Sequence, residues 1–144
     1  MQLKRQVEWG IHCCLTLAEL PTNEFLSAGK LAALYRLPKP YLAKTLQALS
    51  RAGLLGKAMG PDGGYCLAKH ESQIFVLDIV EAIEGTSPSF IDTGIGRRAR
   101  KMDLASSCPV NEVMMAADQE WRSVLGRVSL RQLRSTLEPS TRPP

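Results

Sequence analysis

The sequence predicts a mainly α-helical fold with a small β-hairpin. The segment from 26 to 67 reads as two short helices, a tight turn between them and a hairpin with a glycine-rich tip. A later segment, from about 109 to 128, carries an apolar stripe at helical spacing. Together they predict a winged helix-turn-helix domain plus a long C-terminal dimerisation helix. The expected divisions are the winged domain at 1–85, a flexible sensing loop at 86–106, a dimerisation helix and terminal turn at 107–137, and a disordered tail at 138–144.

The first short helix has a clear start and a clear end. Ser27 is a suitable N-cap for a helix that runs to about residue 34, with Leu31 and Leu34 facing inward. Pro38 must end that helix, because proline lacks the backbone donor and restricts the residue before it. Pro40 is tolerated if it lies in the first turn of the next helix.

The second short helix is predicted to have one apolar and one polar face. Leu42, Leu46 and Leu49 recur at spacings of four and three, and Gly53 is expected just past the helix end. The opposite face is expected to carry Lys39, Tyr41, Lys44, Thr45, Gln47 and Arg51, none of which is acidic. Such a face suits a helix that lies along phosphates and base edges, although an ordinary solvated helix face has the same composition.

The hairpin that follows favours the DNA-binding interpretation of this helix face over that of an ordinary solvated face. Gly60, Gly63 and Gly64 permit a turn with positive φ between two short strands, which gives the wing of the fold. A helix-turn-helix followed closely by a wing is an arrangement that binds double-stranded DNA. We therefore expect Ser27, Lys57, Met59 and Gly60 to join the recognition helix in contacting DNA.

Two further helices are expected to support this domain. One runs from about residue 6 to 20 and stops at Pro21, with Cys13 and Cys14 as small core or interface residues. The other runs from about 74 to 83 and ends at Gly85. Between 85 and 106 the apolar periodicity is lost, and a basic run at 97–101 lies in what we interpret as a mobile loop.

The long helix is expected to mediate homodimerisation. Its apolar stripe is too long for a small domain to cover alone, and pairing with a second copy would bury it. Packing against the first helix of the same chain is the alternative, and both contacts are expected together. The residues assigned to dimerisation are Val113, Ala117, Trp121 and Val124.

Composition agrees with a DNA-binding protein of the cytoplasm. Net charge is +4 and the sequence pI is about 9.0, a mild basic excess. No membrane-spanning apolar run and no signal peptide are present, so a cytoplasmic protein with four reduced cysteine thiols is expected. None of the cysteines forms a CxxC pair, so a structural zinc site is not expected. No catalytic motif of a hydrolase, kinase or dehydrogenase is present, so an enzyme is not expected.

Several motifs together resemble the Rrf family of winged-helix regulators, whose members include IscR, NsrR and RsrR. They are the Pro40-Tyr41-Leu42 helix start, the sequence RAGL at 51–54, the wing GPDGGY at 60–65 and LDIVEAIEG at 77–85. The resemblance implies a homodimeric bacterial transcription factor, often a repressor. Many members sense iron–sulfur status, nitric oxide or redox state through a cluster near the long helix.

The same resemblance directs attention to possible cluster ligands. Cys108 matches the last of three family cysteines, whereas the other two positions hold Met102 and Gly96. The segment 8–14 resembles RsrR, in which Glu and His of the first helix complete the cluster, so Glu8 and His12 are further candidate ligands. The implied cofactor is a labile iron–sulfur cluster. The alternatives are a surface Glu8–His12 pair with a helix-start thiol, and a cluster-free regulator that responds to cysteine oxidation, a small ligand or a partner protein.

The wing departs from the family pattern at one position. Members often carry Arg just before the Gly-Pro of the wing, where it enters the minor groove, and here that position is Met59. Lys57 is near but lacks the planar fork of Arg, so a different operator from the usual one is expected.

Overall fold

The computed structural model describes residues 2–103, 105 and 108–137. Its helices are α1 (Arg5–Ala18), α2 (Ala28–Tyr35), α3 (Lys39–Arg51), α4 (Val76–Glu84), α5 (Ile95–Ala99), α6 (Pro109–Gly126) and α7 (Leu130–Ser135), with a 3-10 turn at Glu71–Gln73. Strands β1 (Leu55–Ala58) and β2 (Gly64–Leu67) form an antiparallel hairpin. The mainly helical fold with a two-stranded wing is confirmed. The tail expected at 138–144 lies outside the described residues.

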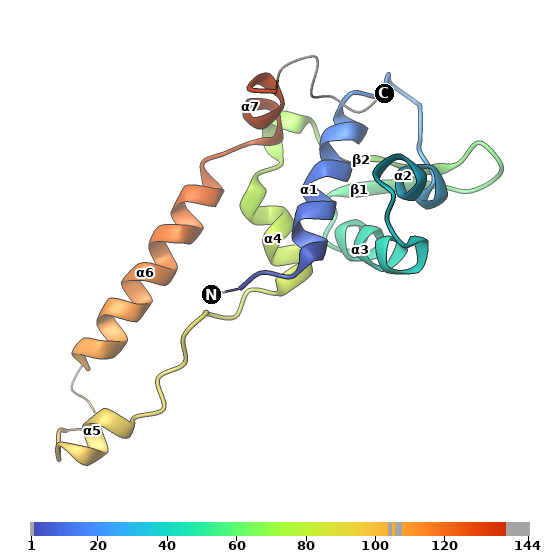
Figure 1. Cartoon of the computed structure of the whole chain (residues 1–144). Coiled ribbons are helices and arrows are strands. Elements are labelled where there is room, and N and C mark those ends of the chain that lie inside the picture. Colours follow the sequence, from blue (N-terminus) through green and yellow to red (C-terminus); the bar gives the residue numbers. More distant parts are fainter. Residues whose placement is uncertain (1, 104, 106–107, 138–144) are drawn as a thin grey trace.

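The molecule divides into a body and a projecting arm (Figure 1). The body contains the four helices α1 to α4, the hairpin and α7. The arm, residues 86–126, leaves the body as an extended segment, reaches α5 at its far end and returns along α6 (Figure 1). In the described part of the chain, no helix combines the length and apolar character needed to cross a membrane.

The core of the body is built around α1. Cys13 and Cys14 are fully buried there, as expected for small core residues. Burial raises the pKa of the Cys13 thiol to about 12 and raises the pKa of Cys14 as well, because the interior disfavours the thiolate. Neither thiol is therefore poised for reaction. Gly10 allows α1 and α4 to approach closely, since an added Cβ would lie 2.9 Å from Cδ1 of Ile83.

The helix-turn-helix forms as the sequence predicts. The Ser27 hydroxyl accepts a hydrogen bond from the Lys30 amide and caps α2. Helix α2 ends at Arg36, which adopts a left-handed conformation with φ of 54°. Pro40 lies in the first turn of α3, and Gly53 follows the helix end with φ of 78°. Leu42, Leu46 and Leu49 of α3 are fully buried.

The wing is attached to the body by core contacts of Leu55 and Tyr65 and by a backbone pairing. Leu26, just before α2, pairs with Tyr65 of β2: the Leu26 amide donates to the Tyr65 carbonyl at 3.0 Å, and the reverse bond is 2.7 Å. Gly64 makes this approach possible. A Cβ at that residue would lie 2.4–2.5 Å from backbone atoms of Leu26 and Ser27.

The apolar stripe of α6 is divided between two environments. Trp121, Leu125 and Val128 pack against Val7, Val76 and Val80 of the body. Four other apolar side chains of α6 are exposed: Val110, Val113, Met114 and Val124. Trp121 was expected in the dimer contact, but its side chain packs within its own chain, so it does not belong to the free face.

Helix α6 ends earlier than expected, at Gly126, because the chain then turns extended to pair with the body. The Val128 carbonyl accepts from the Val76 amide at 2.9 Å, and the Leu130 amide donates to the Ile74 carbonyl at 2.8 Å. Ser129 caps α7 through the Gln132 amide. These bonds hold the C-terminal end of α6 against the start of α4.

A polar cluster then sets the direction of the arm. The Arg122 guanidinium donates to Asp118 at 3.0 Å, to Glu81 of α4 at 3.1 Å and to the Ser87 carbonyl at 2.8 Å. Asp118 also accepts from the backbone amide of Ser89 at 3.1 Å. Hydrogen bonds from Ser89, first from its backbone amide, and then from Arg122 and Trp121 lower the pKa of Asp118 to about 2. The carboxylate is therefore charged at neutral pH and joins α6, α4 and the outgoing segment.

The described part of the expected loop contains a short helix, α5. Asp92 accepts from the Gly94 amide at 2.9 Å and pairs with the Arg97 guanidinium at 2.6 Å. The short helix is thus held by one carboxylate at its start. Sequence periodicity missed α5 because none of its residues is buried in the core.

Candidate nucleic-acid interface and sensing residues

A groove lies where α2, α3 and the wing meet. It has a volume of about 380 Å³ and receives side chains from all three elements. Residues predicted to contact DNA that line it are Ser27, Lys39, Gln47, Lys57, Met59 and Gly60. None of the lining residues is acidic. The structure therefore brings together predicted residues that are up to 33 positions apart (27 to 60) in the sequence.

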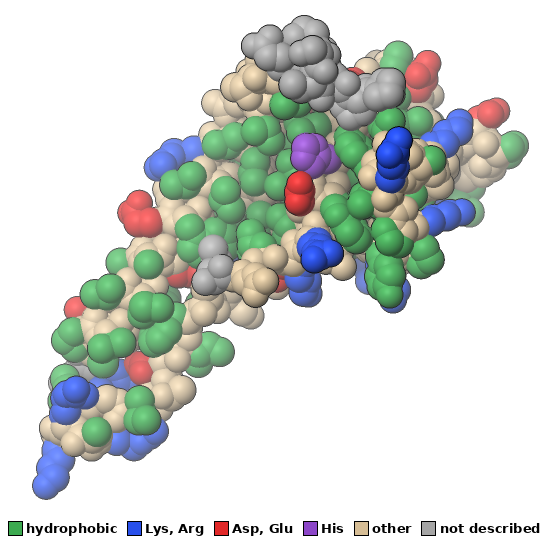
Figure 2. Space-filling view, in the orientation of Figure 1, with side chains coloured by type: hydrophobic (Ala, Val, Ile, Leu, Met, Phe, Trp, Pro, Cys, Tyr) green, Lys and Arg blue, Asp and Glu red, His purple; other side chains and the backbone are tan. Residues whose placement is uncertain are grey.

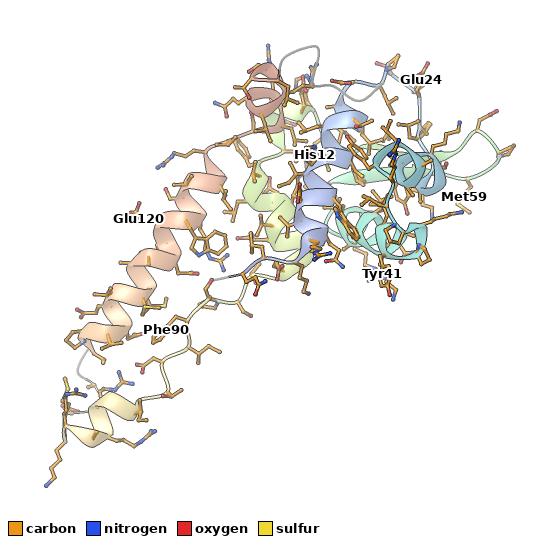
Figure 3. The ribbon with its side chains drawn as sticks, in the orientation of Figure 1. His12, Glu24, Tyr41, Met59, Phe90 and Glu120 are labelled. Atoms are coloured by element: carbon orange, nitrogen blue, oxygen red, sulfur yellow. The ribbon has the colours of Figure 1, made fainter. Side chains whose placement is uncertain are left out.

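The outer surface of α3 continues this interface. Tyr41 is 56% exposed, and Lys44, Gln47 and Arg51 are exposed on the same helix. Figure 3 labels Tyr41 on α3 and Met59 on the wing, the two ends of the surface. Cations and hydrogen-bonding side chains without acids are the chemistry that phosphates and base edges require.

Thr45 does not belong to this surface, and its predicted place on the exposed face is wrong. Its side chain is 3% exposed, and its hydroxyl donates to the Tyr41 carbonyl at 3.1 Å. The spacing contained the signal, since Thr45 is three residues after Leu42 and four before Leu49, on the buried side.

The wing presents one cation and one large apolar side chain. The Lys57 ammonium lies over the Tyr65 ring, 5.6 Å from its centroid, and Met59 is 85% exposed at the tip. The turn closes through the Gly63 amide, which donates to the Gly60 carbonyl at 3.1 Å. Tyr65 was not among the residues predicted for the interface, although its buried ring contacts the Lys57 ammonium.

The sensing residues, defined as Glu8, His12 and Cys108, do not meet within one chain. Glu8 and His12 are one turn apart on the exposed side of α1 in the body. Cys108 lies at the start of α6, at the far end of the arm (Figure 1). Among the described residues, no group of three or more His, Cys, Asp and Glu side chains is placed to hold a metal ion.

The surroundings of Cys108 do not fit a cluster held by cysteines of one chain. A Cβ added at Gly96 would lie 3.6 Å from the Cys108 sulfur, so position 96 is its neighbour in space but supplies no thiolate. Met102, at the other family position, offers only a thioether, which is a weak ligand. One thiolate is insufficient for the usual three-cysteine arrangement.

Comparisons with known proteins agree with this architecture. The model of the Rrf2 family, described as an iron-dependent transcriptional regulator, matches residues 3–136. BadM of Rhodopseudomonas palustris, named as an HTH-type transcriptional regulator, is 31% identical over 143 residues, covering 99% of this chain and 86% of that protein.

Two solved structures share the fold. The structure of CymR, the global cysteine regulator of B. subtilis, has a TM-score of 0.75 at 22% identity and covers 96% of this chain and 99% of that one. The structure of T. potens IscR has a TM-score of 0.69 at 20% identity, covering 98% and 91%. At these identities the likeness concerns the fold.

Two glycines of the wing allow a test of how much its attachment to the body contributes to stability. Both Gly60 and Gly64 have positive φ, but a Cβ at Gly60 meets nothing within 4 Å. We expect Gly60→Ala to cost about 1 kcal/mol of backbone strain. We expect Gly64→Ala to cost more, about 3 kcal/mol, because strain adds to a clash with the Leu26 backbone. Urea unfolding measures both, and equal losses would contradict the proposed role of the Leu26–Tyr65 pairing.

Proposed function

Because this chain belongs to the Rrf2 family of transcriptional regulators, we propose that it acts as a homodimeric repressor that binds operator DNA through α3 and the wing. The family consists of regulators and not of enzymes. In this proposal α3 lies in the major groove, and the wing lies against the backbone or the minor groove, in the cytoplasm of a bacterium.

One observation carries the DNA-binding assignment. Side chains from α2, α3 and the wing line a single groove that contains no acid, and the exposed face of α3 adds Lys44 and Arg51 beside it. We assign Tyr41, Lys44 and Gln47 to base edges. We assign Lys39, Arg51 and Lys57 to phosphates, with the Ser27 hydroxyl and the Gly60 backbone close to the sugar-phosphate chain. Met59 takes the wing-tip position, where an apolar side chain makes no phosphate contact.

The recognition helix provides the direct test of this assignment. We expect Lys44→Ala to weaken operator binding by about 1–3 kcal/mol if it contacts a base. Lys39→Ala should weaken binding to all sequences and reduce its salt dependence, because it removes a phosphate contact. Lys69→Ala is the matched control, since this exposed lysine lies outside the groove. Gel-shift titrations at several salt concentrations measure these effects, and unchanged affinity in all three variants would reject the assignment.

The exposed apolar face of α6 supports the homodimer. Val113 is 67% exposed and Val124 is 48% exposed, and Ala117 lies between them on the same helix face. Figure 2 shows this apolar surface along the arm. A second copy with the same face would bury it under two-fold symmetry and present two recognition helices to a palindromic site.

A charge on this face should dissociate the dimer. We expect Val113→Glu and Val124→Glu to give folded monomers, because a carboxylate buried against an apolar partner is strongly unfavourable. Gln119→Glu adds the same charge on the opposite side of α6, where the residue is exposed, and should leave the dimer intact. Sedimentation velocity measures the association state. A monomeric wild-type protein would reject the proposal, as would dimers of all three variants.

We further propose that the regulator responds to redox status. Cys108 is half-buried at the arm tip, and oxidation of its thiol is the response that uses this chain alone. The second candidate is a labile iron–sulfur cluster to which Glu8 and His12 of one subunit and Cys108 of the other contribute. Its support is the one-turn spacing of Glu8 and His12 on an exposed helix face.

The two candidates predict different spectra. Protein purified without oxygen should be colourless if Cys108 acts as a thiol, and brown with visible absorption if a cluster is bound. In both cases Cys108→Ser should make DNA binding indifferent to oxidant, whereas His12→Ala should do so only in the cluster case. Cys66→Ser is the control, since Cys66 is the other cysteine that is not fully buried. An unchanged oxidant response in Cys108→Ser would place the sensing function elsewhere.

A further inference from the structure

An aromatic pocket lies on the exposed side of α1. Its volume is about 250 Å³, and it is lined by Glu8, Trp9, His12, Tyr35 and Leu37. The rings of His12 and Tyr35 are 5.8 Å apart with a tilt of 48°. Aromatic faces beside a carboxylate form an environment that favours a cation, because the ring quadrupole and the negative charge act in the same direction.

The polar groups of the pocket walls differ in whether they are free to bind a ligand. The Tyr35 hydroxyl donates to the His12 carbonyl at 3.0 Å and shares a hydrogen bond with the Thr16 hydroxyl. Burial raises the pKa of Tyr35, so this phenol stays neutral. Glu8, by contrast, makes no hydrogen bond or ion pair with any described residue and faces solvent. The Glu8 carboxylate is thus available to a cation from outside the described chain.

The arm tip carries several positive charges, which are complementary to the Glu8 carboxylate. Arg97 forms an ion pair with Asp92, whereas Arg98, Arg100 and Lys101 are exposed and form no ion pair with a described residue. Blue Lys and Arg side chains gather at this end of the molecule in Figure 2. These three side chains, Arg98, Arg100 and Lys101, are defined as the tip cations. Of the three, only Arg98 interacts electrostatically with Asp92 among the described residues, and that carboxylate is already paired with Arg97.

We propose that the aromatic pocket of one subunit receives a tip cation of a second copy, an Arg98 or Arg100 guanidinium. The inference rests on the proposed homodimer. The chain's own tip lies at the far end of the arm and away from α1 (Figure 1), so the complementary charge must come from another molecule. A planar guanidinium suits the site because it stacks on rings while it pairs with a carboxylate.

The placement of the two surfaces supports a second copy as the occupant. His12, labelled in Figure 3, lies on the face of the molecule that Figure 2 displays, together with the exposed apolar surface of α6 and the basic tip. The pocket and the tip therefore lie on the same side of the molecule as the face proposed for dimerisation. Two-fold symmetry would form the contact twice.

This contact would connect sensing and DNA binding. Tyr35 and Leu37 belong to the end of α2 and the turn before α3, and the tip that supplies the cation also holds Cys108. A change at the tip of one subunit would then act directly on the helix-turn-helix of the other. The pocket residues would bind a protein cation at the place where the resemblance puts a metal.

Charge reversal tests the contact. The variants are Glu8→Lys, the double variant Arg98→Glu with Arg100→Glu, and the combination of all three. We expect the first two each to raise the dimer dissociation constant about tenfold or more, and the combination to return it to within about threefold of wild type. Glu24→Lys is the control: Glu24 is exposed on another part of the body, labelled in Figure 3, and should neither weaken the dimer nor rescue the double variant.

Trp9 reports on the pocket itself. The chain has two tryptophans, so Trp121→Phe leaves Trp9 as the single indole. We expect its emission to change when the dimer dissociates on dilution, and this change to be absent with Arg98→Gln and Arg100→Gln. Trp121 packs against the body, so the Trp121→Phe protein is the reference for the arginine variants, and thermal melting checks that each of them is folded.

The outcomes separate this inference from the proposed function. A stable dimer that binds DNA but shows no charge-swap rescue overturns the pocket contact and leaves the function in place. A folded wild-type monomer overturns both. A dimer with rescue and no operator binding overturns the proposed function alone.

Discussion

The direction of the arm depends on the Arg122 guanidinium. It joins Asp118 on its own helix, Glu81 on α4 and the Ser87 carbonyl at the start of the outgoing segment. The arm is also attached through the apolar contacts of Trp121 and Leu125 and through the backbone hydrogen bonds that follow α6. A planar group with several fixed donors adds a directional constraint. Removing it would leave Glu81 and Asp118 as neighbouring anions.

Helix α4 is the element through which the arm reaches the DNA-binding surface. It packs against α6 on one side and against α1 and α3 on others. Ile79 of α4 is fully buried, and Gly10 of α1 lies close to it, so little free volume separates the helices. Close-packed helices move as rigid units. A rotation of α6 would therefore move α4 and, through it, α3. An event at the arm changes operator affinity only if it favours one of two such arrangements.

Local sequence signals predicted the elements of the body. Single residues with a clear conformational preference mark the helix ends: Ser27 caps α2, Pro40 lies in the first turn of α3, and Gly53 follows the end of α3. Signals between distant residues were not visible. The Leu26–Tyr65 pairing and the contact of Trp121 with the body depend on where other elements lie. Thr45 is an intermediate case, because its spacing placed it with the leucines while its polarity suggested the surface.

The candidate sites, too, could be predicted only where they depend on local sequence. The residues of α3 and the wing could be assigned because they follow from one local fold, and the groove confirms that most of them lie together. The sensing residues could not be assembled from the sequence, since Glu8 and Cys108 belong to different ends of the molecule. Their meeting requires a second copy, and the sequence of one chain does not specify how two copies are arranged.

The arm tip is held together by contacts within the chain. Asp92 accepts from the Gly94 amide and pairs with the Arg97 guanidinium, and the Met102 amide donates to the Arg97 carbonyl. Arg97 Nε is nevertheless buried without a partner in the described chain. An unsatisfied buried donor costs about 1–3 kcal/mol, and an acceptor from outside the chain would remove that cost. The tip thus has the properties of a segment that is folded by its own residues and completed by another molecule.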